Sequence, residues 1–319
     1  MNSKTENRLR LTILGGFLGS GKTTWLRHQL HEKTFGRVHV IVNEAAEVPV
    51  DDVLLGAADQ ITLLAGACVC CDGQHQLEAL LLRLCDDRSS IADPTVRLET
   101  IVLETSGLAD PAAILSLIQS HPILIRQIVI SEIIVIVDAL NAVEHMQCEA
   151  LSRKQIEAAD RLILTKTDLS TEQDTARLCA TLRSLAPSAI QLAASFGSPL
   201  TLNPPEMDVP HFALLELSNK DSDPILASQL DLGDEADWTA FTVWLSALLY
   251  ARGDQIVRIK GVVCTPAGRL LLQTVRQSVQ SPEVLPDLDC PLATDNTIAV
   301  IGRGFTQGQL VESLANFLA

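Results

Sequence analysis

The stretch GFLGSGKTT, Gly16–Thr24, decides the fold of this chain. It fits the pattern G-x-x-x-x-G-K-[ST], in which Gly16 and Gly21 are the fixed glycines and Lys22-Thr23 closes the motif. An apolar run precedes it and a helical pattern follows it. A phosphate-binding motif requires this strand-before, helix-after context, whereas a glycine-rich turn that matched the motif by chance would not require it. Glycines let backbone N–H groups turn onto phosphate oxygens, and a helix N-terminus adds positive potential. The stretch therefore predicts a phosphate-binding loop in an α/β domain.

Each residue type in this loop has a task in nucleotide binding. The Lys22 side chain can reach the β- and γ-phosphates, and the Thr23 hydroxyl is placed to bind Mg²⁺. The predicted nucleotide-binding residues of the loop are Gly16, Gly19, Ser20, Gly21, Lys22, Thr23 and Thr24.

Short β-rich runs alternate with helical patterns through the first half of the chain, as is typical of βαβ units and a parallel sheet. Several of the runs are apolar on both faces, as expected for strands that helices cover on each side. We therefore expect a P-loop NTPase domain with a mostly parallel sheet flanked by helices. The expected strands are 10–16, 37–43, 59–65, 98–104, 132–138 and 161–166, and the expected helices are 22–32, 74–87 and 110–121.

The composition changes after Ser195, where Pro, Gly, Ser and Asp become frequent and periodicity is lost. We interpret this part as a linker. Beyond it the pattern predicts a smaller α+β domain, with a hairpin at the PAG sequence between two strands. The expected domains are a P-loop domain over 8–195, a linker over 196–236 and a carboxyl-terminal domain over 237–319. Within the carboxyl-terminal domain we expect helices at 237–253 and 308–319 and strands at 256–265, 269–279 and 297–302.

Composition limits the partners and the compartment. The 319 residues carry a formal net charge of -15, and this acidic balance argues against a nucleic-acid-binding surface. Apolar runs are far shorter than the roughly 20 residues that span a bilayer, so we expect no membrane segment. The polar N-terminus lacks the apolar core of a secretory signal, and we expect a cytoplasmic protein whose eight cysteines are free thiols or ligands.

The segment LETSGLADP, Leu103–Pro111, follows one of the expected buried strands. A carboxylate at the carboxyl end of a strand, Glu104, sits where a Mg²⁺-bound water can be held. Gly107 lets a backbone N–H approach the γ-phosphate. The alternative is that Glu104 merely caps the following helix, a task that suits Asp110 better because it directly precedes a proline.

The segment TKTD, Thr165–Asp168, ends another buried strand and points to the identity of the base. A carboxylate such as Asp168 can accept hydrogen bonds from the N1–H and N2–H₂ edge of guanine, which adenine cannot supply. The stem of Lys166 can cover the plane of the base. The alternative is an ordinary loop with an exposed aspartate. Because a phosphate-binding loop precedes this segment in the chain, the guanine interpretation is favoured over that alternative.

Three thiols, Cys68, Cys70 and Cys71, lie within the segment GACVCC. Thiolates bind borderline and soft cations such as Zn²⁺ and Cu⁺ and, less exclusively, Co²⁺ or Ni²⁺. Three ligands leave a fourth position open, which suits transfer of a metal better than permanent binding. A redox pair and buried inert thiols are the alternatives.

The fourth position of this predicted metal site has two main candidates. Glu47 belongs to the segment NEAAEVPVDD, which precedes the thiols in the sequence. His121 lies at the end of an expected helix. For His121 the alternative is a helix C-terminal histidine that the helix dipole favours. His75 is a further possible ligand, although an exposed helix face suits it better.

Taken together, the chain resembles the metallochaperone GTPases of the CobW type, within the SIMIBI class of P-loop proteins. Five segments match in order, and the carboxyl half resembles the family's C-terminal domain through IVRIKGVV, LLLQTVRQSV and IAVIGRG. Departures from the family pattern are Ala45-Ala46 in place of Phe-Gly, Thr165 where Asn is commoner, and the lack of a histidine-rich tract. The five matching segments are GGFLGSGKTT, VNEAAEVPVDD, GACVCC, LETSGLADP and TKTD.

The resemblance implies GTP binding and slow GTP hydrolysis to GDP, coupled to the handling of a transition metal. It places Lys22, Glu104 and Gly107 at the reacting γ-phosphate, with Mg²⁺ on Thr23. It assigns guanine recognition to Thr165, Lys166 and Asp168. It assigns Asn43, Glu44, Glu47 and Asp51 to a switch segment and the three thiols to the metal.

The function expected from these features is delivery of Zn²⁺, or alternatively Co²⁺, to a client metalloprotein or a metal-cofactor synthesis enzyme. A homodimer is compatible with this interpretation. A P-loop small-molecule kinase is one alternative, but no basic lid is evident and TKTD has no task in an adenine kinase. A non-catalytic nucleotide-dependent scaffold is the other, and it predicts no turnover.

Overall fold

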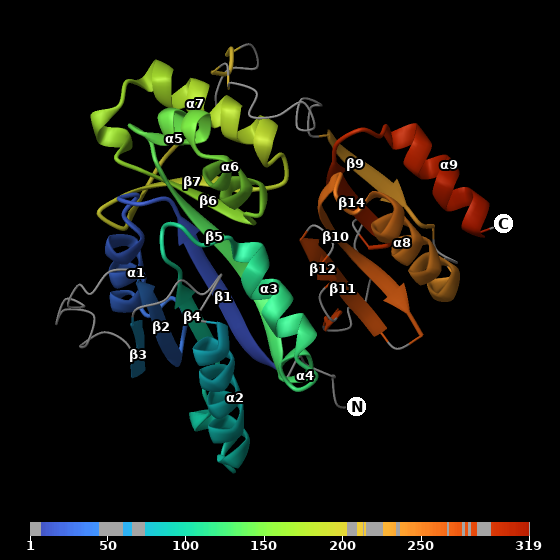
Figure 1. The fold of residues 1–319 in the computed structure, drawn as a ribbon, viewed down its shortest axis with the longest axis horizontal. Helices are drawn as coiled ribbons and strands as arrows, with labels where there is room; N and C mark the ends of the chain where they lie inside the picture. Colours follow the sequence, from blue (N-terminus) through green and yellow to red (C-terminus); the bar gives the residue numbers. More distant parts are fainter. Residues whose placement is uncertain are drawn as a thin grey trace. The chain divides into compact units, whose positions relative to one another are not determined.

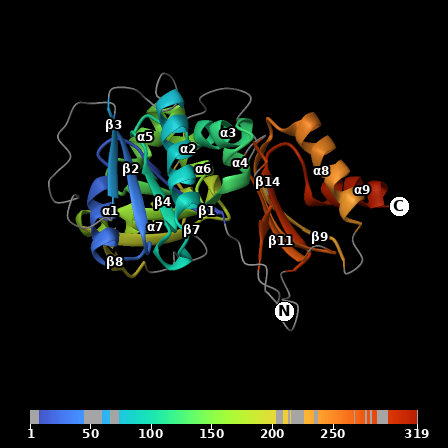
Figure 2. The ribbon, with the colours of Figure 1, turned by 90° about the horizontal axis from the view of Figure 1, so that it is seen from below.

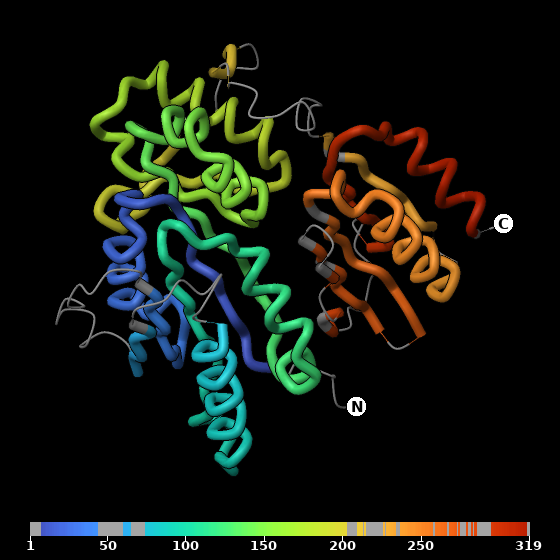
Figure 3. Tube along the Cα trace, viewed as in Figure 1, coloured from blue at the N-terminus to red at the C-terminus, as the bar shows by residue number. Residues whose placement is uncertain are grey.

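The computed structural model describes the greater part of the chain. By its internal contacts the chain divides into a first unit, residues 9–219, and a second unit, residues 220–319 with 1–8. The course of the chain can be followed in Figure 3. The described residues are 8–44, 60–65, 74–202, 209–212, 214, 226–233, 237–266, 268–275, 278–279, 282–285 and 295–318.

The first unit is built on an eight-stranded sheet in the order β3-β2-β4-β1-β5-β6-β7-β8 (Figure 1). All neighbouring strands are parallel except β7 and β8, which are antiparallel. The strands are β1 (Leu9–Gly16), β2 (Val38–Glu44), β3 (Gln60–Ala65), β4 (Thr100–Glu104), β5 (Ile128–Asp138), β6 (Arg161–Thr165), β7 (Ile190–Ser195) and β8 (Ser198–Leu200).

Helices cover both faces of this sheet (Figure 2). On one face, Trp25, Leu26 and Leu30 of α1 pack against the apolar side chains of the central strands. β4 is buried at all five positions, which explains its continuous apolar sequence. The helices are α1 (Lys22–His31), α2 (Gln74–Ser90), α3 (Pro111–Ser120), α4 (Leu124–Gln127), α5 (Ala142–Cys148), α6 (Ala150–Glu157) and α7 (Glu172–Leu185), with short 3₁₀ turns η1 (Pro94–Val96) and η2 (Thr167–Leu169).

The position of β1 in the sheet determines where a ligand can bind. β1 lies between β4 and β5, so the chain order reverses on its two sides. In open α/β sheets, ligands bind outside the carboxyl ends of the strands at such a switch point. The phosphate-loop stretch begins at the carboxyl end of β1. The expectation of a mostly parallel sheet flanked by helices is confirmed.

His39 ties the edge strand β3 to β2. Its ring is buried, with Nδ1 3.1 Å from Gln60 Oε1 and Nε2 2.8 Å from Thr62 Oγ1. Burial lowers the pKa of His39 below its usual value of 6.5. The positive charge of Arg83 on α2 lowers this pKa further, and the hydrogen bond with Gln60 opposes both effects. His39 is therefore held neutral in the folded chain.

We expect the stabilising effect of neutral His39 to be complete above pH 6.5 and to be lost as the pH falls. Below that pH the unfolded chain takes up a proton before the folded chain does, so the free energy of unfolding decreases. Urea unfolding of the wild type and His39→Gln at about pH 7.5 and about pH 5.5 measures this. The stability gap between the two proteins should narrow on acidification; an unchanged gap would contradict the assignment.

In its described residues, the second unit is a smaller antiparallel sheet with two helices. Its strands run in the order β12-β11-β10-β14-β9, and β13 pairs with β11. β10 and β11 form a hairpin, as the PAG sequence predicts. The elements are β9 (Leu226–Asp231), α8 (Trp238–Arg252), β10 (Ile256–Thr265), β11 (Gly268–Val275), β12 (Ser278–Val279), β13 (Glu283–Val284), β14 (Thr297–Gly302) and α9 (Gln307–Leu318).

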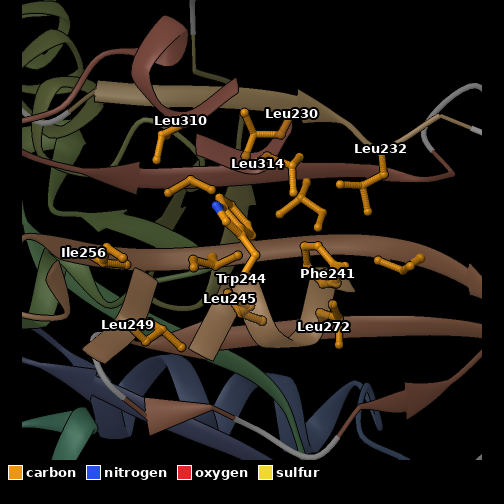
Figure 4. Close-up of a cluster of buried hydrophobic side chains, with 14 of the residues drawn as sticks. Leu230, Leu232, Phe241, Trp244, Leu245, Leu249, Ile256, Leu272, Leu310 and Leu314 are labelled. Atoms are coloured by element: carbon orange, nitrogen blue, oxygen red, sulfur yellow. The ribbon is translucent and has the colours of Figure 1, made fainter. Parts of the chain in front are cut away.

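The core of the second unit forms between its sheet and its helices. Phe241 and Trp244 of α8 lie at its centre, among aliphatic side chains from β9, β10, β11, β14 and α9 (Figure 4). Asp237 begins α8 by accepting hydrogen bonds from two backbone N–H groups of the first turn. The expectation of a smaller α+β domain in the carboxyl half is confirmed.

A buried ion pair crosslinks the sheet of the second unit. Arg269 on β11 donates to Asp295 through Nη2 at 2.7 Å and through Nε at 3.1 Å. The Asp295 side chain is 4% exposed and the Arg269 side chain 13% exposed. Two parallel N–H···O bonds fix the relative orientation of both groups.

Two strands lie inside the range that the sequence suggested was a linker, 196–236. β8 pairs with β7 in the first unit, and β9 pairs with β14 in the second. β8 is three exposed residues long, and so it carries no apolar period. The domain boundaries 8–195 and 237–319 stay predictions. Within the described part of the chain, no helix is long and apolar enough to cross a membrane.

Candidate functional site

The predicted site residues of the first unit gather at the carboxyl edge of its sheet. The phosphate loop extends from the end of β1, Glu104 ends β4, Asp138 ends β5 and the TKTD segment begins at the last residue of β6. These four strands are neighbours, in the order β4-β1-β5-β6. Residues separated by more than a hundred positions in the sequence are therefore brought to one place.

The phosphate loop requires glycine at its entrance. Gly16 has φ +136°, and a Cβ there would lie 2.4 Å from the Ile136 carbonyl oxygen of β5. Gly19 and Gly21 also have positive φ values, which suit glycine. The Ser20 hydroxyl inside the loop is buried and has no hydrogen-bond partner within the described part of the chain. The loop is thus a tight turn with a buried polar atom, suited to an anionic ligand.

Lys22, the first residue of α1, folds back over this loop. Its Nζ donates to the Gly16 carbonyl at 2.9 Å and to the Phe17 carbonyl at 3.2 Å. The ammonium group is therefore held at the centre of the loop. A cation in that position, together with the N-terminus of α1, creates a site for phosphate.

Thr23 and Glu104 are brought together across the first unit. Thr23 Oγ1 donates to Glu104 Oε1 at 2.6 Å, and Glu104 is 3% exposed. The capping alternative for Glu104 does not hold, because Asp110 caps α3 by accepting from the Ala112 N–H at 2.9 Å. A hydroxyl beside a buried carboxylate is an oxygen set of the kind that Mg²⁺ prefers.

Gly107 packs against the phosphate loop with no room for a side chain. A Cβ there would lie 2.7 Å from the Leu18 backbone nitrogen. From the other side, buried Gln155 of α6 donates to the Gly107 carbonyl at 3.1 Å and to the Ala109 carbonyl at 2.8 Å. Gln155 thereby fixes the segment after Glu104. No sequence motif pointed to it, because its partners lie almost fifty residues away.

On the other side of the loop, the TKTD segment is tied to the phosphate loop by two hydrogen bonds. The Thr165 hydroxyl donates to the Ser20 carbonyl at 2.8 Å, and Lys166 Nζ donates to the Gly19 carbonyl at 3.0 Å. Lys166 has φ +58°, a left-handed conformation that directs its side chain back over the loop. The threonine in place of asparagine therefore still links the two segments.

Asp138 at the end of β5 holds Lys166 through an ion pair of 2.7 Å. Burial alone would raise the pKa of the Asp138 carboxyl, but hydrogen bonds from Lys166 and Asn141 outweigh burial and hold that pKa below its usual range. The carboxylate therefore stays ionised and fixes the lysine stem. Asp138 belongs to none of the sequence motifs; the signal for it is a charged residue that ends a buried apolar strand.

A pocket of about 250 Å³ opens beside the TKTD segment. Its walls come from three separate places in the sequence: the loop with the first turn of α1, the TKTD segment with η2, and the β7–β8 turn. It has room for a nucleobase, and Asp168 lies exposed at its rim. Residues that line the pocket include Gly21, Trp25, Lys166, Asp168, Leu169 and Phe196.

The β7–β8 turn, Phe196-Gly197, is a third feature that the sequence motifs did not indicate, after Gln155 and Asp138. Gln29 of α1 donates to the Gly197 carbonyl at 3.3 Å, and His28 Nε2 lies 3.1 Å from Ser198 Oγ. A Cβ on Gly197 would lie 2.2 Å from the His28 Cβ. The turn is therefore seated on the same helix that carries Lys22.

The predicted metal ligands Cys68, Cys70, Cys71 and Glu47 lie outside the described residues. Within the part that is described, no group of three or more His, Cys, Asp or Glu residues could hold a metal ion. Burial raises the pKa of Cys85 to about 11, so that its thiol stays protonated. This agrees with a structural role for that cysteine.

His121 is at the end of α3, close to the start of α2. Its Nδ1 accepts weak hydrogen bonds from the Ile123 and Leu124 N–H groups, and its Nε2 lies 3.7 Å from Glu78 Oε1. These N–H groups belong to the start of α4 and are not the last carbonyls of α3, so they do not test the dipole alternative. Nε2 faces a carboxylate on α2, the helix that begins three residues after Cys71. The metal role of His121 stays a prediction.

Two family models match the chain. "CobW/HypB/UreG, nucleotide-binding domain" matches residues 10–192, and "Cobalamin synthesis protein cobW C-terminal domain" matches residues 229–318. The first match spans the sheet from β1 into β7 and includes the phosphate loop, Glu104 and the TKTD segment. It ends before the β7–β8 turn. The second spans most of the second unit.

Two curated proteins and one solved structure place these matches in context. The zinc chaperone YjiA of Escherichia coli is 40% identical over 169 residues, 53% of this chain and 52% of that protein. The zinc chaperone CobW of Pseudomonas aeruginosa is 28% identical over 231 residues, 62% of this chain and 60% of that protein. The chain thus spans about half the length of the curated relatives it matches. A Zn(II)-bound triple mutant of the YjiA GTPase superposes with a TM-score of 0.62 at 25% identity, covering 98% of this chain and 100% of that chain.

Proposed function

Because the chain belongs to the CobW/HypB/UreG family of nucleotide-binding proteins, we propose that it is a GTPase metallochaperone. In this proposal it binds GTP and hydrolyses it to GDP, carries Zn²⁺ as cargo and hands the ion to a client metalloprotein. The names of its relatives, a zinc chaperone and a GTPase, support zinc over cobalt.

One observation carries the nucleotide part of the proposal. Lys22, the Thr23–Glu104 pair and the Lys166–Asp138 pair converge on one loop at the switch point of the sheet. The phosphate end and the base end of a nucleotide would meet different chemistry there: cation, hydroxyl and carboxylate at one end, an apolar pocket with Asp168 at the other. This asymmetry suits a nucleoside triphosphate.

The chemistry assigned to each residue follows from its position. Lys22 stabilises negative charge that shifts onto the phosphate oxygens during cleavage. Thr23 and Glu104 would hold Mg²⁺, whose contribution when bound is to neutralise phosphate charge. Glu104 orients the attacking water, and Gly107 presents a backbone N–H to the γ-phosphate. Asp168 accepts from the guanine edge, so that adenine is rejected.

The metal part of the proposal rests on the order of segments along the chain. β2 leads into the predicted switch segment 43–52, and β3 leads directly from Ala65 to the three thiols. Switch segments respond to the γ-phosphate in other P-loop proteins. A response of this segment to GTP would be passed along the chain to Cys68, Cys70 and Cys71.

We expect Zn²⁺ to bind about 5- to 150-fold more tightly with a non-hydrolysable GTP analogue than with GDP, the usual range of coupling between two sites. Competition against a zinc indicator measures this. Cys70→Ala should abolish both the tight site and its nucleotide dependence. Cys148→Ala is the matched control, since Cys148 is an exposed thiol in the first unit and should leave zinc affinity unchanged. Equal affinities with both nucleotides would refute coupling, and an unchanged Cys70→Ala protein would refute the thiol site.

A further inference from the structure

The turn that joins β7 to β8 holds a residue in an unfavourable conformation. Phe196 has φ +49° and Gly197 has φ +94°, and Ser195 pairs with Ser198 across the turn. Positive φ at both central residues is the pattern of a type I′ turn, which strongly prefers Asn-Gly or Gly-Gly. Glycine meets that demand at the second position. At the first, a bulky aromatic residue with positive φ is an outlier.

The same residue is exposed to an unusual degree. Residue Phe196 is 84% exposed, although burial of an aromatic ring is strongly favourable. Strain of this kind persists where the surroundings enforce it, and it concentrates at functional sites. Here the surroundings do enforce it, through the contacts of Gly197 and Ser198 with Gln29 and His28 on α1.

Phe196 also lines the pocket beside TKTD, together with Leu169 and the Lys166 segment. An aromatic ring, an aliphatic side chain and a lysine stem give the pocket walls that are mainly apolar. Planar bases stack on aromatic side chains, and stacking tolerates any base because every base has a π-face. Figure 2 shows β8 close to α1, the helix that begins at the phosphate loop.

From these observations we propose that Phe196 covers one face of the nucleobase. The base stacks on the Phe196 ring. Nucleotide binding therefore buries the aromatic surface that the β7–β8 turn holds exposed to solvent. Phe196 supplies affinity and Asp168 supplies base selectivity. The inference rests on the proposed function in so far as a nucleotide occupies this pocket.

The test compares Phe196→Asn with Phe196→Trp. Asparagine suits the first position of a type I′ turn, so Phe196→Asn should fold with an unfolding temperature at or above that of the wild type. We expect its dissociation constant for GDP to rise about 5- to 150-fold, the range for loss of one base–aromatic stack. Phe196→Trp should bind GDP nearly as the wild type does. Titration calorimetry gives all three constants.

A second measurement separates stacking from hydrogen bonding. Inosine diphosphate lacks the N2 amino group, so the ratio of GDP to inosine diphosphate affinity reports on Asp168. We expect Phe196→Asn to leave this ratio unchanged and Asp168→Asn to reduce it. Equal GDP affinity of wild type and Phe196→Asn, an equal loss in Phe196→Trp, or an altered ratio in Phe196→Asn would each overturn the inference. A wild type that binds no guanine nucleotide would instead overturn the proposed function.

Discussion

Replacing Lys22 with alanine is expected to lower kcat/KM for GTP hydrolysis by about 10²- to 10³-fold, the usual loss when one charge-stabilising donor is removed from an active site. The ammonium lies within 3.2 Å of two loop carbonyls, Gly16 and Phe17, and so it is already in place before the phosphates move. Such preorganisation is what makes a cation effective in the transition state. The fold should survive, because α1 is held by Trp25 and its apolar neighbours.

Lys154→Ala is the control for this prediction. Lys154 is exposed on α6, and its replacement by alanine changes the net charge by the same amount. Phosphate release at saturating and limiting GTP separates kcat from KM for both variants. A Lys22→Ala protein that hydrolyses GTP at the wild-type rate would show that the turnover arises elsewhere.

Replacing Arg269 with methionine should lower the free energy of unfolding of the second unit by about 3–5 kcal/mol, the usual cost of removing one partner from a buried ion pair. The Asp295 side chain is 4% exposed, so water cannot replace the bidentate guanidinium. Removing both charges in Arg269→Met/Asp295→Leu should restore most of the loss, because buried pairs replaced by apolar residues are often neutral in stability.

Tryptophan fluorescence during urea unfolding can assign this effect to a unit. Trp238 and Trp244 belong to the second unit, while Trp25 belongs to the first. In a background with Trp25→Phe, the signal reports on the second unit alone. If Arg269→Met unfolds at the same urea concentration as its parent, the ion pair contributes nothing to the free energy of unfolding of the second unit. That result would contradict the prediction that leaving buried Asp295 unpaired is destabilising.

Local motifs were predicted from the sequence because their geometry depends on adjacent residues. The run Gly16–Thr24 contains the strand end, the positive-φ glycines and the first turn of α1, and all of these follow from residue types in order. The alternation of apolar runs and helical patterns likewise predicted the parallel sheet, since buried strands have a composition of their own.

Features that depend on distant residues could not be predicted in this way. Gln155 is an ordinary helix residue until α6 is packed beside Gly107. Phe196 begins a stretch rich in Pro, Gly and Ser, and this composition predicts a linker. The strand that follows, β8, has only three residues, which are too few to show an alternating apolar pattern. Only the sheet order makes the turn after β7 a wall of the pocket.

The double attachment of α1 has a consequence for how this chain can vary. One end of the helix carries Lys22, and His28 and Gln29 near its other end carry the β7–β8 turn. A one-residue insertion between these points would rotate one attachment relative to the other by about 100° and shift it by about 1.5 Å along the helix axis. In the proposed nucleotide complex, the length of α1 would set the distance between the phosphate loop and the wall of the base pocket. We therefore expect insertions and deletions in α1 to be disfavoured even at its exposed positions.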